Sequence, residues 1–291
     1  MSGSIGGSRI LREEVQPTLN NYINNVLKGF PGFVSAQITG SYNAGTKKDH
    51  GDIDLAVYIE GDDIKKIKKD FKEYLESLDD GLTPRFIFGR NEGKKAQMYG
   101  TIVTCGSPIS GREDCYVQVD NIIVNSKEAQ RFQKEFLDLD AAKQGLLMGL
   151  IRVILNYRNF NTILNRIEIT NLPGLGWNQE YEFVLSSAGV SLRRVTLNEE
   201  MKEVSRDELW RSCDWDVVKF ITNGFDFSLP YEELLDKVAV MTMGDDRSRR
   251  RIIGIMKSMV NVGIAEQGTP KGDAKENAIK LVEEKLMVYG D

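Results

Sequence analysis

Apolar and polar residues alternate along the first half of the chain in a pattern that predicts short strands separated by helices. The clearest strand covers residues 52–60, where apolar residues stand at every second position: Ile53, Leu55, Val57 and Ile59. Successive side chains of a strand point to opposite faces, so the second face of this strand carries Asp52 and Asp54. Similar patterns predict strands at 33–39, 85–88, 98–104 and 116–124, and helices at 10–27 and 62–78.

Beyond residue 126 the pattern becomes mainly helical. Apolar residues at three- and four-residue steps predict a long helical stretch over 127–164 and helices at 205–221, 231–243, 250–262 and 273–289, with strands at 181–185 and 190–195. We therefore expect an α/β (α+β) domain with a short mixed sheet over 10–126. A mainly helical C-terminal domain over 127–291 follows it, and a flexible Ser/Gly-rich tail over 1–9 precedes it.

The composition excludes several kinds of chemistry. The chain has 291 residues, a single histidine, His50, and three cysteines without paired spacing. A histidine-based triad, a multi-histidine zinc site and a disulfide framework are therefore not expected. Acidic residues are plentiful, with 43 Asp and Glu, so catalysis would fall mostly to carboxylates.

Charge and hydropathy limit the cellular location and the binding partners that we expect. No apolar run approaches the ~20 residues that cross a bilayer, and the N-terminus does not resemble a signal peptide. We expect no membrane partner and a cytoplasmic location. The net charge of −5 argues weakly against a protein that coats nucleic acid, but it leaves room for a local basic groove.

Three aspartates form the candidate chemical centre. Asp52 and Asp54 lie two residues apart on one strand, so their carboxylates share a face and repel unless a cation lies between them. Hard divalent ions bound by oxygen offset this repulsion, and two such ions about 3.5–4 Å apart can assist phosphoryl transfer. Asp120 is the expected third ligand, because it stands within an apolar strand where an acid needs a partner.

Gly40 and Ser41 follow the strand predicted at 33–39. A glycine at the end of a strand lets the backbone approach a phosphate closely, and the serine hydroxyl and nearby N–H groups can hold phosphate oxygens. Ser41 could also serve as an ordinary helix cap.

The order Gly40-Ser41, ten intervening residues, Asp52-Ile53-Asp54 and a later Asp120 resembles the motif of the polymerase-beta-like nucleotidyltransferase superfamily. The resemblance covers roughly residues 10–125 and includes template-independent enzymes such as CCA-adding enzymes and poly(A) polymerases. It implies that Asp52 and Asp54 bind two Mg²⁺ ions, with Mn²⁺ as an alternative, and that Asp120 binds the catalytic one. It also implies that Gly40 and Ser41 hold the phosphates of a nucleoside triphosphate, ATP or CTP first, and that pyrophosphate is released.

Basic residues of the second half supply further candidates. In many members of this superfamily a basic residue from the following helical domain reaches the triphosphate, so the resemblance suggests Lys143 and Arg152. Four arginines are concentrated near the start of one predicted helix: Arg247, Arg249, Arg250 and Arg251. They could form a solvated helix face, or a patch that follows the phosphates of an RNA acceptor.

Three functions remain open at this point. The first is nucleotidyl transfer to an RNA 3′ end. The second is the same chemistry on a small molecule, a protein or a second nucleotide, as in the synthesis of a signalling oligonucleotide. The third is an inactive module that binds nucleotides, and in the simplest alternative Asp52 and Asp54 are only the polar face of an edge strand.

Overall fold

The computed structural model describes residues 9–43, 48–78, 85–87, 98–104, 116–200, 202–263 and 273–287. Its contacts divide the chain into two compact units, Met1–Asp138 and Leu139–Asp291. The fold is mixed α/β, as predicted. Except for Arg9, the tail predicted over 1–9 lies outside the described residues.

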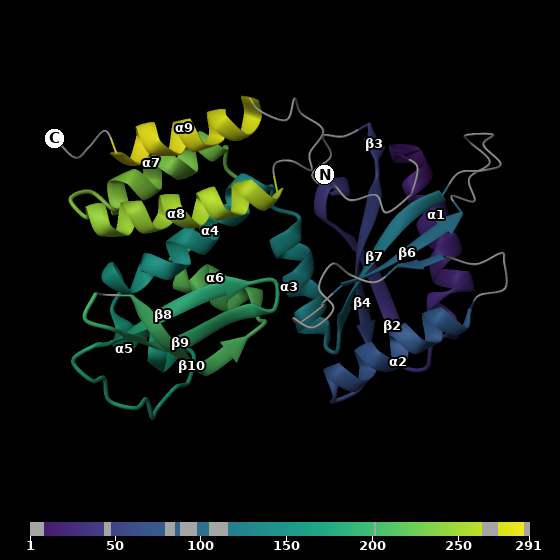
Figure 1. Ribbon diagram of the computed structural model, residues 1–291, viewed down its shortest axis with the longest axis horizontal. Helices are drawn as coiled ribbons and strands as arrows, with labels where there is room; N and C mark the ends of the chain where they lie inside the picture. The colour runs from purple at the N-terminus through teal and green to yellow at the C-terminus, as the bar shows by residue number, and fades with distance from the viewer. Residues whose placement is uncertain are drawn as a thin grey trace. The chain divides into compact units, whose positions relative to one another are not determined.

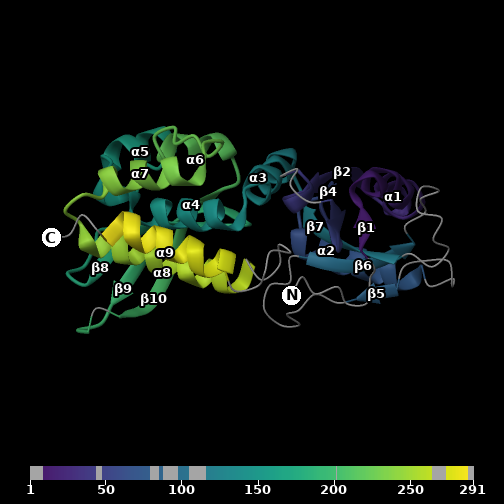
Figure 2. The ribbon, with the colours of Figure 1, turned by 90° about the horizontal axis from the view of Figure 1, so that it is seen from above.

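The first unit is built on a five-stranded mixed sheet in the order β2-β4-β7-β6-β5 (Figure 1, Figure 2). Its elements are β1 (Ile10–Leu11), α1 (Arg12–Asn25), η1 (Leu27–Gly29), β2 (Phe33–Thr39), η2 (Gly40–Tyr42), β3 (Asp49–His50), β4 (Asp52–Ile59), α2 (Ile64–Ser77), β5 (Arg85–Ile87), β6 (Met98–Thr104), β7 (Tyr116–Val124) and α3 (Lys127–Leu137). Strands β4 and β7 pair in parallel, whereas the other neighbours in this sheet are antiparallel. The predicted mixed sheet is therefore confirmed.

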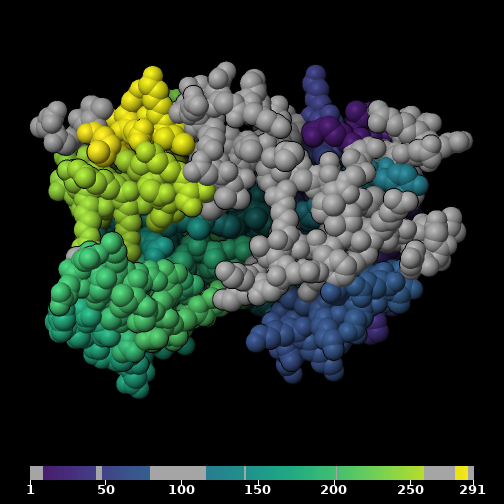
Figure 3. Space-filling view, in the orientation of Figure 1, coloured from purple at the N-terminus to yellow at the C-terminus, as the bar shows by residue number. Residues whose placement is uncertain are grey.

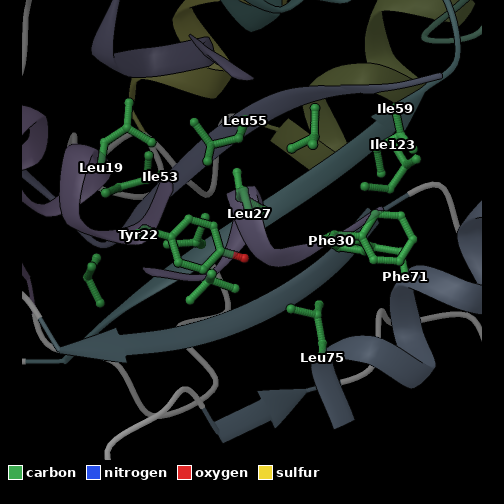
Figure 4. Packing of buried hydrophobic residues seen from close by; sticks show 14 of the residues in the cluster. Leu19, Tyr22, Leu27, Phe30, Ile53, Leu55, Ile59, Phe71, Leu75 and Ile123 are labelled. Atoms are coloured by element: carbon green, nitrogen blue, oxygen red, sulfur yellow. The ribbon is translucent and has the colours of Figure 1, made fainter. Parts of the chain in front are cut away.

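One face of this sheet packs on α1 and α2 and forms the core of the unit. The predicted alternation in β4 is confirmed, because the apolar side chains on this face are buried: Ile53, Leu55, Val57 and Ile59. They pack with Tyr22 and Leu19 of α1 and with Phe71 and Leu75 of α2 (Figure 4). Burial of this face directs the other side chains of β4, including Asp52 and Asp54, away from α1 and α2. The outer side of α2 forms the blue surface in Figure 3.

Helix α3 belongs to the first unit. It begins after Ser126, whose hydroxyl accepts the N–H of Ala129 at 3.0 Å and so caps the helix. The buried Gln130 side chain donates to the backbone oxygen of Ala56 on β4 at 2.9 Å. This contact fastens α3 to the sheet, so the first unit extends to Asp138. The boundary expected from the sequence lies earlier, near residue 126.

The second unit combines helices with a three-stranded antiparallel sheet in the order β10-β9-β8. Its elements are α4 (Ala141–Val153), η3 (Ile154–Asn156), α5 (Phe160–Arg166), β8 (Gln179–Ser186), β9 (Gly189–Leu197), β10 (Glu203–Ser212), α6 (Trp215–Ile221), α7 (Tyr231–Met241), α8 (Asp246–Gly263) and α9 (Asp273–Met287). The strands predicted at 181–185 and 190–195 are confirmed as parts of β8 and β9.

Two predictions for the second half are wrong in detail. The segment predicted as a helix over 205–221 begins as β10, because pairing with β9 overrides its local pattern, and becomes helical only in α6. The stretch predicted as one helical run over 127–164 is divided among α3, α4, η3 and α5. New helices begin where Asp140 and Asn159 accept backbone N–H groups as caps.

Helix α4 lies at the centre of the second unit, between β8 and α8 (Figure 1, Figure 2). A Cβ atom added at Gly149 of α4 would lie 3.1 Å from the Cα of Ile252 on α8. The missing side chain therefore permits the close approach of these two helices. Among the described helices, none is both long enough and apolar enough to span a bilayer.

Candidate functional site

The register of β4 and β7 brings the three predicted aspartates onto one face of the sheet. Asp54 lies directly opposite Asp120, and Asp52 lies opposite Gln118. Partners in a parallel pair point to the same side, so all four side chains share the face that does not carry the α1 and α2 core. The aspartates are half-buried, whereas Gln118 is buried.

The carboxylate of Asp120 accepts a hydrogen bond from an uncharged side chain. The Gln118 side-chain amide donates to Oδ1 of Asp120 at 2.7 Å, as two side chains two residues apart on one face can do. Gln118 was not among the predicted site residues, although its spacing from Asp120 is the same as that of Asp52 from Asp54. Its contact fixes the orientation of Asp120 within β7.

Whether these residues could bind a metal ion depends on the chemistry of their donor atoms and on the orientation of their side chains. Three carboxylates on one face form an all-oxygen donor set, which suits Mg²⁺ or Mn²⁺. As the side chains are oriented, however, no three His, Cys, Asp or Glu residues of the described part of the chain gather closely enough to hold an ion. The backbone positions fit a shared site, and binding would require the carboxylates to turn toward a common point.

Arg9 is a basic neighbour that the sequence analysis did not identify. Its guanidinium pairs with Asp49 at 2.7 Å. This hydrogen bond raises the pKa of Arg9, and the charge of Asp52 contributes to the rise, against the opposing effect of burial. A positive charge therefore lies near the start of β4.

Gly40 is required where β2 ends, for a reason different from the predicted one. Its φ of +75° lies in the left-handed region that favours glycine. A Cβ atom at this position would lie only 2.6 Å from Oδ2 of Asp54. The glycine therefore provides room for the Asp54 carboxylate beside the turn, and Ser41 follows it, half-buried, within η2.

The N–H group of Gly40 already has an anionic partner. It donates to Oδ1 of Asp138 at 3.1 Å, and the side-chain amide of Asn43 donates to the same carboxylate at 2.8 and 3.0 Å. The expected phosphate contact of Gly40 would use a donor that Asp138 occupies in this structure. A phosphate role for Gly40 and Ser41 stays a prediction.

Lys143 and Arg152 have partners inside the second unit. The ammonium group of Lys143 donates to the backbone oxygen of Phe227 at 2.9 Å. The guanidinium of Arg152 forms two hydrogen bonds of 2.8 Å with the buried carboxylate of Glu182. Both side chains therefore have partners within their own unit, and their proposed contact with triphosphate stays a prediction.

The arginine cluster does not form one continuous surface. Arg249 is fully buried and donates to the Thr242 hydroxyl at 3.1 Å and to the Ala239 oxygen at 3.0 Å. The expectation of a nucleic-acid contact through Arg249 is therefore wrong, because its side chain faces the core. Arg251 bonds to Glu182 at 2.6 Å, which leaves Arg247 and Arg250 as the exposed members.

Known proteins resemble this chain only weakly, and only in structure. No protein-family model matches the sequence, and no curated protein matches it either. Similar solved structures include polymerase beta of Leishmania infantum in a ternary P/T complex, with 14% identity and a TM-score of 0.41 over 75% of this chain and 74% of that chain. The same polymerase in a ternary gap complex has 15% identity and a TM-score of 0.39 over 75% and 68% of the two chains.

Proposed function

We propose that this chain is a metal-dependent nucleotidyltransferase, which moves a nucleoside monophosphate from a nucleoside triphosphate to an acceptor hydroxyl and releases pyrophosphate. The single observation that carries the proposal is the register of β4 and β7, in which Asp54 and Asp120 are direct partners and Asp52 follows the same face. An edge strand with an ordinary polar face gives no reason for a third carboxylate at the matching position of the neighbouring strand.

Each residue has a distinct part in the proposed reaction. Asp52 and Asp54 would hold both cations and Asp120 one of them, and Asp120 takes the proton of the acceptor hydroxyl if a side chain does so. The acceptor oxygen forms a bond to the α-phosphorus while the bond to the pyrophosphate oxygen breaks. Two divalent ions, when bound, would lower the pKa of the acceptor hydroxyl and offset the charge of the leaving pyrophosphate. Ser41 contributes a hydroxyl for the phosphates.

The test offers the full-length chain all four labelled nucleoside triphosphates, with Mg²⁺ or Mn²⁺, and measures pyrophosphate release and label transfer. We expect Asp54→Asn and Asp120→Asn each to lower the rate by at least about a thousandfold, because each removes a charge that the reaction requires. The matched control is Asp62→Asn, which removes an exposed carboxylate just beyond the other end of β4. Equal rates in the control and the site variants would contradict the proposal.

The acceptor that we propose to test first is an RNA 3′ end, with ATP and CTP as the first donors. Arg250 is exposed and could contact phosphates, and Arg247 is exposed but pairs with Glu180 at 3.6 Å, whereas Arg249 is buried. Parallel reactions without RNA, followed by chromatography, detect a dinucleotide or a modified small molecule instead. Transfer in those reactions alone would shift the proposal to the second class of acceptor.

A further inference from the structure

We infer that Asp138 is a positioning residue for the candidate site, whose carboxylate fixes the turn at Gly40 and Ser41 and thereby the place of the Asp54 carboxylate. The inference deepens the proposed function and rests on it. Asp138 lies at the end of α3, 98 residues from Gly40 in sequence, and it has no part in the motif that the sequence resembles.

One carboxylate gathers donors from both the turn and the helix. Oδ1 of Asp138 accepts the Gly40 N–H at 3.1 Å, and Asn43 donates to both carboxylate oxygens. The ammonium group of Lys134, one helical turn earlier, lies 2.5 Å from Oδ2. The Asn43 amide also donates to the Ile38 oxygen at 2.8 Å. The carboxylate therefore ties together the start and the end of the turn that follows β2.

The position of Asp138 is not explained by the stability of its own helix. It is the residue that ends α3, where the backbone carbonyls give the helix a partial negative charge. A carboxylate there is unfavourable for the helix unless donors offset it, and Lys134 is one such donor. The contacts with Gly40 and Asn43 therefore account for an aspartate at this position, and they act on the turn.

The conformation of this turn also limits the room available to the Asp54 carboxylate. Gly40 has its left-handed conformation while its N–H points to Asp138, and in this conformation its Cα hydrogen faces Oδ2 of Asp54. A loosened turn would change both the room for the Asp54 carboxylate and the orientation of Ser41. The competing role, in which Asp138 blocks the Gly40 N–H from a phosphate, predicts the opposite effect on KM.

The test compares Asp138→Ala and Asp138→Asn with the wild-type chain. Hydrogen exchange is measured in a peptide that covers residues 36–43, and KM and kcat are measured with a nucleoside triphosphate and Mn²⁺. The control is Glu128→Ala, which removes a carboxylate from the exposed first turn of the same helix. We expect Asp138→Ala to speed exchange in the peptide about tenfold and to raise KM about tenfold, with a smaller fall in kcat. Asp138→Asn retains an acceptor oxygen, so it should fall between Asp138→Ala and the wild type.

The outcomes separate this inference from the proposed function. Exchange in residues 36–43 that is unchanged by Asp138→Ala would overturn the inference, whatever the activity. A lower KM in either Asp138 variant would also overturn it, in favour of a blocking role. A wild-type chain that transfers no nucleotide contradicts the proposed function, and exchange that Asp138→Ala nevertheless accelerates would then still show that Asp138 fixes the turn.

Discussion

Gly40 is the residue at which backbone conformation and candidate chemistry meet most closely. Its positive φ and the 2.6 Å between a Cβ atom and Oδ2 of Asp54 leave no room for a side chain. We expect Gly40→Ala to lower the free energy of unfolding by about 1–2 kcal/mol, from the left-handed conformation alone. Displacement of Asp54 should lower the nucleotidyl-transfer rate at least about a hundredfold.

Urea unfolding and steady-state kinetics check this prediction. Gly174→Ala is a suitable control, because no atom lies within 4 Å of the position of its Cβ and its φ is not positive. Full activity in Gly40→Ala would contradict the crowding of Asp54 by the turn.

Arg249 shows how a charged residue can be mistaken for a surface residue. It is fully buried, and its two hydrogen bonds fasten α8 to Thr242 and Ala239 near the end of α7. We expect Arg249→Ala to lower the free energy of unfolding by about 3 kcal/mol, since it leaves a cavity and buried acceptors without donors. The substitution Arg250→Ala, at the exposed neighbouring residue, should change the free energy of unfolding by less than about 0.5 kcal/mol.

Chemical denaturation of the two variants measures the difference, and equal stabilities would show that Arg249 is not part of the core. In RNA binding we expect the opposite order, with the larger effect from Arg250→Ala. If RNA is the acceptor, a filter-binding assay should show weaker binding for Arg250→Ala, whereas Arg249→Ala that remains folded should bind as the wild type does.

At the residue scale, the sequence predicts side chains that follow a period and misses those that depend on distant contacts. The alternation in β4 places Asp52 and Asp54 on the face opposite the core, as the structure has them. Asp138 could not be found in this way, because its partner Gly40 is 98 residues away and only folding brings the two together. Arg249 was misassigned because a run of arginines does not show which member faces the core.

At the scale of elements, the buried Glu182 on β8 connects one strand with two helices. Its carboxylate accepts hydrogen bonds from Arg152 on α4 and from Arg251 on α8, at 2.6 to 2.8 Å. We expect Glu182→Gln to lower the free energy of unfolding by about 3 kcal/mol, because two guanidinium groups would lose their buried counter-charge. Equilibrium unfolding in urea measures the loss.

The control for this prediction lies on the same strand. Glu180 is partly exposed and pairs with Arg247 and Arg251 at 3.6 and 3.5 Å, so Glu180→Gln should change the stability by less than about 1 kcal/mol. Similar losses in both variants would show that burial of Glu182 does not strengthen its pairs.

Elements were predicted best where one face of a strand or helix is buried against a single core. Strands β6 and β7 have the bounds that the sequence predicts. Strand β10 was taken for a helix because most of its side chains are exposed, which leaves no alternation to detect. Pairing with β9, in which Glu208 and Arg193 are partners, holds this segment as a strand although its local pattern does not predict one.

At the scale of the whole molecule, each of the two units has its own core. The first unit contains the three aspartates and the turn at Gly40, while the second contains the remaining basic candidates. The boundary expected from the sequence lies before α3, because helical periodicity does not show on which unit a helix packs. The bond from Gln130 to Ala56 assigns α3 to the first unit.

Anomalous diffraction from crystals of the chain grown with Mn²⁺ and a non-hydrolysable nucleoside triphosphate tests the shared cation site most directly. We expect two manganese peaks about 3.5–4 Å apart, each about 2.1 Å from carboxylate oxygens. Asp52 and Asp54 should contact both ions, and Asp120 should turn from Gln118 to contact one. Manganese bound elsewhere, with Asp120 still bonded to Gln118, would contradict a shared cation site.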